Sequence, residues 1–94
     1  MSRTVATRAV ELGEHLAAWR KLLNLTTTQV AERAGVTRNT LRAIENGTGA
    51  ATLAAMLQVA QALGVLDKLV DSVDPYKTDI GRLRAGLIDR QRVR

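Results

Sequence analysis

The chain has 94 residues, no cysteine and a formal net charge of +5 at neutral pH. This length favours a single domain, and the absence of cysteine excludes disulfide bonds and thiolate metal sites. The core has to be built from Leu, Val, Ile and Ala, because the chain has no Phe, one Trp and one Tyr, and this composition favours helices. No apolar run of signal-peptide length opens the sequence, so a cytoplasmic location is expected.

The basic charge is concentrated in the two ends of the chain. Seven basic and three acidic side chains give residues 1–44 a net charge of +4, and five Arg and two Asp give residues 79–94 a net charge of +3. The middle, residues 45–78, has two basic and four acidic side chains and a net charge of −2. This distribution suits a polyanion-facing side on the N-terminal half, and it also suits a charge that only keeps the protein in solution.

Apolar side chains at helical spacing predict a first helix over residues 8–23. Asn24 suits the left-handed backbone position that ends a helix. The spacing i, i+4, i+7, i+11 places four apolar side chains, Trp19 among them, in one buried stripe. These are Leu12, Leu16, Trp19 and Leu23.

A second helix is predicted to begin after Thr26. Thr26 and Gln29 have the T-x-x-Q spacing of a capping box, in which each side chain bonds to a backbone N–H of the other. Gly35 ends this helix, because the chain has to turn sharply there and glycine adopts positive φ without strain. Val36 then anchors the turn in the core. The inward face of the helix consists of Val30, Ala31 and Ala34.

A third helix is predicted over residues 38–45, with Thr37 as its N-cap. Leu41 and Ile44 face inward. Asn46 and Gly47 end the helix. The side chains that project outward are Arg38, Asn39 and Arg42.

Two further helices complete the predicted domain, which spans residues 8–74. Thr52 caps the fourth helix, residues 53–63, and Asp74-Pro75 stops the fifth, residues 66–73. The apolar faces of these helices consist of Leu53, Leu57, Ala60 and Leu63, beside Met56 and Val59, and of Leu66, Leu69, Val70 and Val73.

The basic C-terminal tail, residues 75–94, has two interpretations. Residues 79–94 are either a short amphipathic helix or an arm that orders only against a partner. Gly81 and Gly86 each weaken a helix there by about 1 kcal/mol. The tail is expected to contact a second protomer, a partner protein or DNA phosphates, and a disordered, solubilising end is the alternative.

The segment Thr26–Gly47, TTTQVAERAGVTRNTLRAIENG, resembles the helix-turn-helix of phage-repressor-like (Xre/Cro-type) proteins. The VAERAGV turn and the IENG ending are its most specific parts, and the resemblance covers about Leu12 to Leu69. It implies an all-α, five-helix lambda-repressor-like DNA-binding domain followed by a C-terminal arm. In that family the third helix enters the major groove of double-stranded DNA.

The resemblance implies four base-reading positions on the third helix. Arg bonds bidentately to guanine O6 and N7, and Asn bonds to adenine N6 and N7. The alternative is that the two arginines form a solvated helix face and contribute only charge. The four positions are Thr37, Arg38, Asn39 and Arg42.

Phosphate contacts are expected from Thr27 and Asn46. Thr27 lies at the N-terminus of the second helix, where backbone N–H groups attract phosphate. The family commonly has Gln at this position, so the side-chain contact departs from the family pattern. For Asn46, the need to end a helix is an almost equally good explanation. The resemblance also places Arg20 beside Glu45, a pair interpreted as structural support for the recognition helix.

The expected function is that of a homodimeric transcriptional repressor that reads two half-sites about 34 Å apart. The layout of a short repressor-like domain, the segment GVLDKLVDSVDP and an Arg-rich end is similar to HipB-like antitoxins. These proteins repress their own operon and bind a HipA-like kinase toxin. The alternative is an autonomous Xre-type regulator with no toxin partner. The expected dimer surface consists of Leu66, Leu69, Val70, Val73 and Ile80.

No catalytic site, metal site or cofactor is expected. His15 is the only histidine and is expected on a helix surface. An RNA-binding role is disfavoured, because Trp19 is predicted to be buried and Tyr76 stands alone, whereas RNA recognition generally uses stacking aromatics. The uncharged stretch 46–66 is long enough for a membrane span, but polar residues and glycines interrupt it, so no membrane helix is expected.

Overall fold

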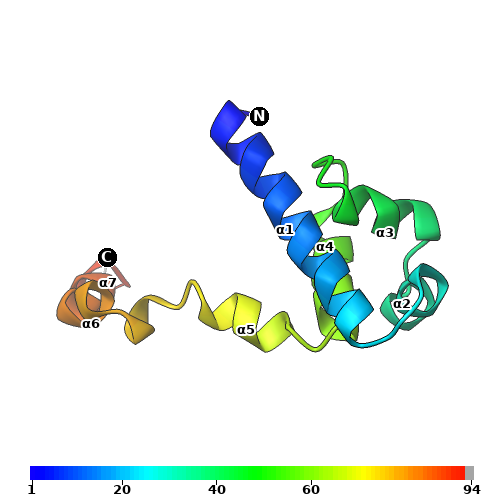
Figure 1. The fold of residues 1–94 in the computed structure, drawn as a ribbon. Helices are drawn as coiled ribbons and strands as arrows, with labels where there is room; N and C mark the ends of the chain where they lie inside the picture. Colours follow the sequence, from blue (N-terminus) through cyan, green and yellow to red (C-terminus); the bar gives the residue numbers. More distant parts are fainter. Residues whose placement is uncertain (93–94) are drawn as a thin grey trace.

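The computed structural model describes the backbone of residues 1–92 and the side chains of residues 1–88 (Figure 1). All regular secondary structure in this part of the chain is helical, which confirms the predicted all-α class. The five predicted helices correspond to α1–α5, and the tail forms a 3-10 turn and two short helices. In chain order the elements are α1 (Arg3–Leu22), α2 (Thr27–Ala34), α3 (Arg38–Glu45), α4 (Leu53–Ala62), α5 (Leu66–Asp71), η1 (Pro75–Lys77), α6 (Asp79–Leu83) and α7 (Ala85–Arg92).

The first helix begins earlier than its apolar pattern indicated. The hydroxyl of Ser2 accepts a hydrogen bond from the N–H of Val5 at 3.1 Å, and this cap starts the helix at Arg3. The predicted start near Arg8 was therefore wrong. The end agrees with the prediction, because Asn24 adopts a left-handed conformation with φ of 58°.

The predicted apolar stripe on α1 is only partly buried. Leu16 is buried, whereas Leu12, Trp19 and Leu23 are 36%, 39% and 45% exposed. The prediction that Trp19 is buried was wrong. The reason is that α1 packs against α3 through buried Gly13, so Leu12 and Trp19 line an open groove beside the core instead.

Helices α2 and α3 form the core with α4, as their patterns predicted. Val30 on α2 and Leu41 on α3 are fully buried, and so is Val59 on α4. The capping box of Thr26 and Gln29 is present, with hydrogen bonds of 3.1 and 2.9 Å. The remaining buried side chains of α2 and α3 are Ala31, Ala34 and Ile44.

Two apolar positions of α4 and α5 differ from their predicted environments. Leu53 is 74% exposed, because α4 turns Ala55 and Val59 inward and a residue two places from Ala55 lies on the opposite side of a helix. Helix α5 ends at Asp71, where Ser72 follows as its C-cap, so Val73 lies outside the helix and is 80% exposed.

The tail forms helices that stand apart from the domain, beyond the end of α5 (Figure 1). Thr78 caps α6 through its hydroxyl, which accepts a hydrogen bond from the N–H of Gly81 at 3.0 Å. Gly81 lies so close to the carbonyl oxygen of Pro75 that no Cβ fits there. The glycine that weakened the helix prediction is therefore what allows α6 to pack on η1.

Candidate nucleic-acid interface

The start of α3 is held by Thr37. Its hydroxyl accepts a hydrogen bond from the N–H of Thr40 at 3.1 Å and donates one to Oγ1 of Thr40 at 2.9 Å. Thr37 is thus the N-cap of α3. Both hydrogen bonds of the hydroxyl are made to Thr40. Thr37 can therefore contact a base only through its methyl group or through the remaining lone pair of its hydroxyl oxygen.

The outward face of α3 carries three exposed polar side chains, Arg38, Asn39 and Arg42. Arg38 and Arg42 are four residues apart, so they lie one above the other on the same helix face. Within the part of the chain that the structure describes, neither arginine forms an ion pair or a side-chain hydrogen bond. Their guanidinium donors are therefore available for an external acceptor.

The N-terminus of α2 also offers unused donors. The capping box uses the N–H groups of Thr26 and Gln29. The intervening N–H groups, those of Thr27 and Thr28, have no acceptor among the described residues. A helix N-terminus with free N–H groups and a partial positive charge is a favourable place for a phosphate.

The end of α3 does not depend on an asparagine. Asn46 has the ordinary helical conformation, with φ of −84° and ψ of −8°, and Gly47 takes the left-handed position, with φ of 66°. The side chain of Asn46 is exposed and makes no hydrogen bond within the described residues. The structural explanation for this asparagine is therefore weaker than its sequence context suggested.

A bidentate ion pair connects α1 to the end of α3. Nε of Arg20 donates to Oε2 of Glu45 at 2.8 Å, and Nη2 donates to Oε1 at 3.2 Å. A third donor of Arg20, Nη1, bonds to the carbonyl oxygen of Leu25 at 3.2 Å, just before α2. The two charged side chains are only 14% and 12% exposed, so α1, α2 and α3 are tied together through one partly buried guanidinium.

Two glycines set how closely α3 approaches α1. A Cβ on Gly13 would collide with the carbonyl oxygens of Ile44 and Glu45, the last residues of α3. A Cβ on Gly47 would collide with the backbone of α1 at Ala9. Sequence reasoning assigned no role to Gly13, although a glycine in the middle of a predicted helix was the available signal.

The part of the chain that contains α2 and α3 matches a known family model. A family model described as Helix-turn-helix matches residues 16–66, which is more than half of the chain. The chain belongs to the helix-turn-helix family. This agrees with the resemblance to phage-repressor-like (Xre/Cro-type) proteins. Comparison with curated proteins and with solved structures finds no match.

Membership of the helix-turn-helix family makes this protein a DNA-binding transcriptional regulator. The family is one of regulators and not of enzymes. Among the described residues, no three His, Asp or Glu side chains come together as metal ligands. None of the described helices is long and apolar enough to cross a membrane, and α4, within the uncharged stretch, has 10 residues.

Proposed function

We propose that this regulator is a homodimeric repressor and that each protomer reads one operator half-site with α3. The observation that supports this most directly is a pair of exposed arginines on the outward face of α3, Arg38 and Arg42, which form no ion pair among the described residues. The opposite face of α3 is anchored by buried Leu41 and Ile44, so the arginines are presented on a rigid element. Rigid presentation matters because bidentate contacts with guanine tolerate little displacement.

The other interface residues have distinct proposed roles. Asn39 reads adenine, and Thr37 caps α3 while its methyl group contacts a base. Thr27 binds phosphate through its backbone N–H, and Asn46 does so through its side-chain amide. Phosphate contacts hold the protein in register on the duplex, whereas the contacts from α3 carry the sequence information.

The experiment is a gel-shift titration on an operator obtained by in vitro selection. The variant Arg38→Ala with Arg42→Ala is expected to lose specific binding while its far-UV circular dichroism stays unchanged. Each bidentate contact provides about 1–3 kcal/mol of discrimination, so the double variant loses at least about 30-fold in specificity. The control, Lys21→Ala with Lys77→Ala, removes the same charge outside α2 and α3. Retained operator binding by the arginine variant would exclude the proposed recognition surface.

We further propose that the repressor is a cytoplasmic, autoregulatory antitoxin of a HipA-like kinase toxin. The support is the layout of the chain: a compact helix-turn-helix domain, an acidic stretch in and after α5, and an Arg-rich tail. An autonomous regulator without a toxin remains the second candidate. Co-expression with the neighbouring reading frame tests the choice. Co-purification of a kinase-like protein supports the antitoxin, and a neighbouring gene that encodes no kinase favours the autonomous regulator.

A further inference from the structure

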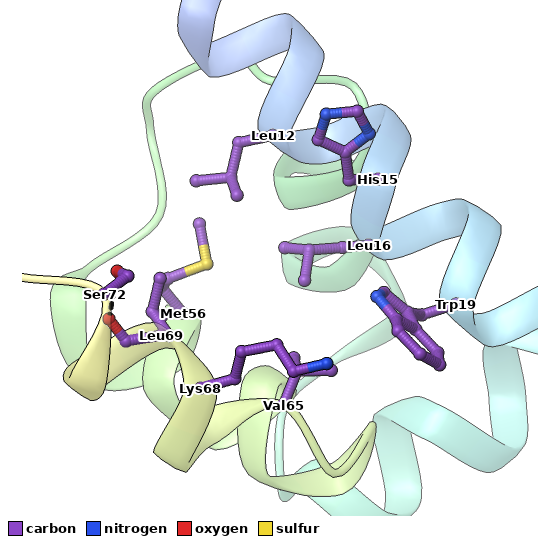
Figure 2. Close-up of a pocket in the computed structure, with 9 residues that line it drawn as sticks. All are labelled: Leu12, His15, Leu16, Trp19, Met56, Val65, Lys68, Leu69 and Ser72. Atoms are coloured by element: carbon purple, nitrogen blue, oxygen red, sulfur yellow. Dashed lines mark hydrogen bonds between the residues drawn. The ribbon is translucent and has the colours of Figure 1, made fainter.

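An apolar groove opens on the side of the domain formed by α1, α4 and α5. Figure 2 shows the side chains that line this groove. The groove has a volume of about 220 Å³. Leu12 and Trp19 form the α1 side, Met56 forms the floor and Leu69 forms the α5 side. The ammonium of Lys68 lies 5.5 Å from the centre of the Trp19 ring. Leu12 and Trp19 remain more than one third exposed, so the groove is unfilled in the single chain.

The tail carries an apolar face that the rest of the chain does not cover. Ile80 and Leu83 on α6 are 62% and 85% exposed, and Leu87 and Ile88 on α7 are 41% and 38% exposed. Although Arg84 separates α6 from α7, Ile80, Leu87 and Ile88 line one pocket of the tail, and Leu83 is the most exposed of the four side chains. The tail therefore presents an apolar surface of its own. Its helices α6 and α7 lie apart from α1 and α4 (Figure 1).

The exposed surface area of the chain is larger than that of a compact monomer of the same mass. A compact monomer of 10.2 kDa exposes about 5,300 Å² and has a radius of gyration of about 12 Å. This chain exposes 7084 Å² and has a radius of gyration of 16.4 Å. The difference of about 1,800 Å² exceeds the roughly 800 Å² that each partner contributes to a standard protein–protein interface.

The charges indicate which surfaces come together. The tail, residues 79–94, has a net charge of +3, whereas residues 45–78, which include α4 and α5, have a net charge of −2. Asp67 on α5, one of the acids counted there, forms no ion pair among the described residues, and Glu14 on α1 adds a further exposed carboxylate, while the groove lining itself includes the cation of Lys68. Two tails would repel each other, whereas the tail and the segment that contains α4 and α5 carry net charges of opposite sign.

We propose that the occupant of the groove is the tail of a second copy of this chain. The apolar face of α6 and α7 in each protomer covers Leu12, Trp19 and Leu69 of the other, which gives a two-fold symmetric, reciprocal interface. This inference rests on the proposed homodimer and names its interface. Leu12 and Trp19 line the groove while Gly13 faces α3, so docking on the groove leaves the recognition helix free for DNA.

Cysteine cross-linking tests this pairing directly, because the natural chain has no cysteine. His15→Cys places a thiol at the groove, and Leu83→Cys places one on the tail. A mixture of the two variants is expected to form the mixed disulfide dimer under mild oxidation. A mixture of Leu83→Cys with Glu32→Cys, whose thiol lies on exposed α2, is the matched control and is expected to stay unlinked. Self-linking of Leu83→Cys, without linking to His15→Cys, would overturn the pairing in favour of a tail–tail dimer.

Light scattering of the full chain gives the second test. The wild type is expected to be a dimer at micromolar concentration, and Leu83→Glu with Leu87→Glu is expected to weaken self-association by about tenfold or more, because a charge is costly in an apolar groove. Both side chains are exposed in the single chain, so unchanged circular dichroism is expected. A monomeric wild type, or a dimer unaffected by these changes, would overturn the proposal.

The two proposals fail in different ways. Arg38→Ala with Arg42→Ala is expected to abolish operator binding and leave the dimer intact. The tail variant is expected to retain contact with a single half-site and to lose the tighter binding to two. Loss of operator binding in a protein that still dimerises therefore tests only the proposed role of α3. Loss of the dimer in a protein that still binds a single half-site tests only the proposed interface between the tail and the groove.

Discussion

Arg20 on α1 and Glu45 at the end of α3 form a bidentate ion pair, although 25 residues separate them in the chain. The third hydrogen bond of Arg20, to the carbonyl oxygen of Leu25, extends the contact to the residue that precedes the N-cap of α2. One side chain therefore connects α1 to both helices of the proposed DNA-binding surface. We expect this partly buried pair to affect function through the position of α3 and not through contact with DNA.

Removal of one partner of this pair is expected to be costly. Arg20→Ala removes the partner of the Glu45 carboxylate, which is 12% exposed in the intact pair, so the free energy of unfolding is expected to fall by about 2–3 kcal/mol, less than for a fully buried pair. Urea denaturation measures the loss. Arg8→Ala is the control, because its pair with Glu11 is solvent-exposed and contributes at most about 1 kcal/mol. Equal losses in the two variants would contradict the proposed bracing role.

A methyl group at Gly13 is expected to separate α1 from α3. Gly13→Ala introduces a collision with backbone carbonyl oxygens that no rotamer change relieves, so a loss of about 1–3 kcal/mol and weaker operator binding are expected. Gly86→Ala is the matched control in a helix, since a Cβ there meets open space, and it is expected to be neutral or stabilising by up to about 1 kcal/mol. Thermal denaturation of both variants gives the comparison, and a harmless Gly13→Ala would show that α3 can shift.

Substitution of Thr27 by proline, compared with substitution by alanine, is expected to show whether phosphate is bound by the backbone N–H or by the side-chain hydroxyl. Thr27 is the first residue of α2, where proline is accepted, and Thr26 already has the extended conformation that precedes proline, with ψ of 162°. Thr27→Pro removes the N–H proposed to bind phosphate together with the side-chain hydroxyl, so DNA affinity is expected to fall about tenfold at unchanged stability, whereas Thr27→Ala removes the hydroxyl alone. Thr27→Ala is expected to have a smaller effect. The same loss in both variants would assign the contact to the hydroxyl.

Alanine substitutions at Asn46 and Gly47 are expected to affect different properties, DNA affinity at Asn46 and stability at Gly47. Asn46→Ala preserves an ordinary helical conformation, so the change in stability is expected to stay within about 0.5 kcal/mol while affinity falls for all DNA sequences alike. Gly47→Ala is expected to destabilise the fold by more than about 1 kcal/mol, because φ is positive there and α1 leaves no space. Denaturation and filter binding distinguish the effects. A destabilised Asn46→Ala would restore the structural explanation of that residue.

The local features of the motif were predictable from sequence because their partners lie within a few residues. Thr26 and Gln29 satisfy each other's backbone, Thr37 caps the next turn, and Gly35 adopts positive φ of 70° at the bend. The alternation of buried Leu41 and Ile44 with exposed Arg38 and Arg42 also follows from helical periodicity alone. The candidate recognition face of α3 could be predicted from the sequence because these features are local.

Other features depended on helices that are distant in sequence. The same apolar spacing on α1 leaves Leu16 buried and Trp19 39% exposed, because only the packing of α3, α4 and α5 decides which part of the stripe is covered. Gly13 acquires its role from the end of α3, and Gly81 acquires its role from Pro75. By itself, the sequence determined that there would be a helix-turn-helix and which side chains of α3 face outward, since hydrogen bonds and periodicity within a helix are local. Only the tertiary structure decided how α1 supports that surface, and that the groove and the tail are both left open.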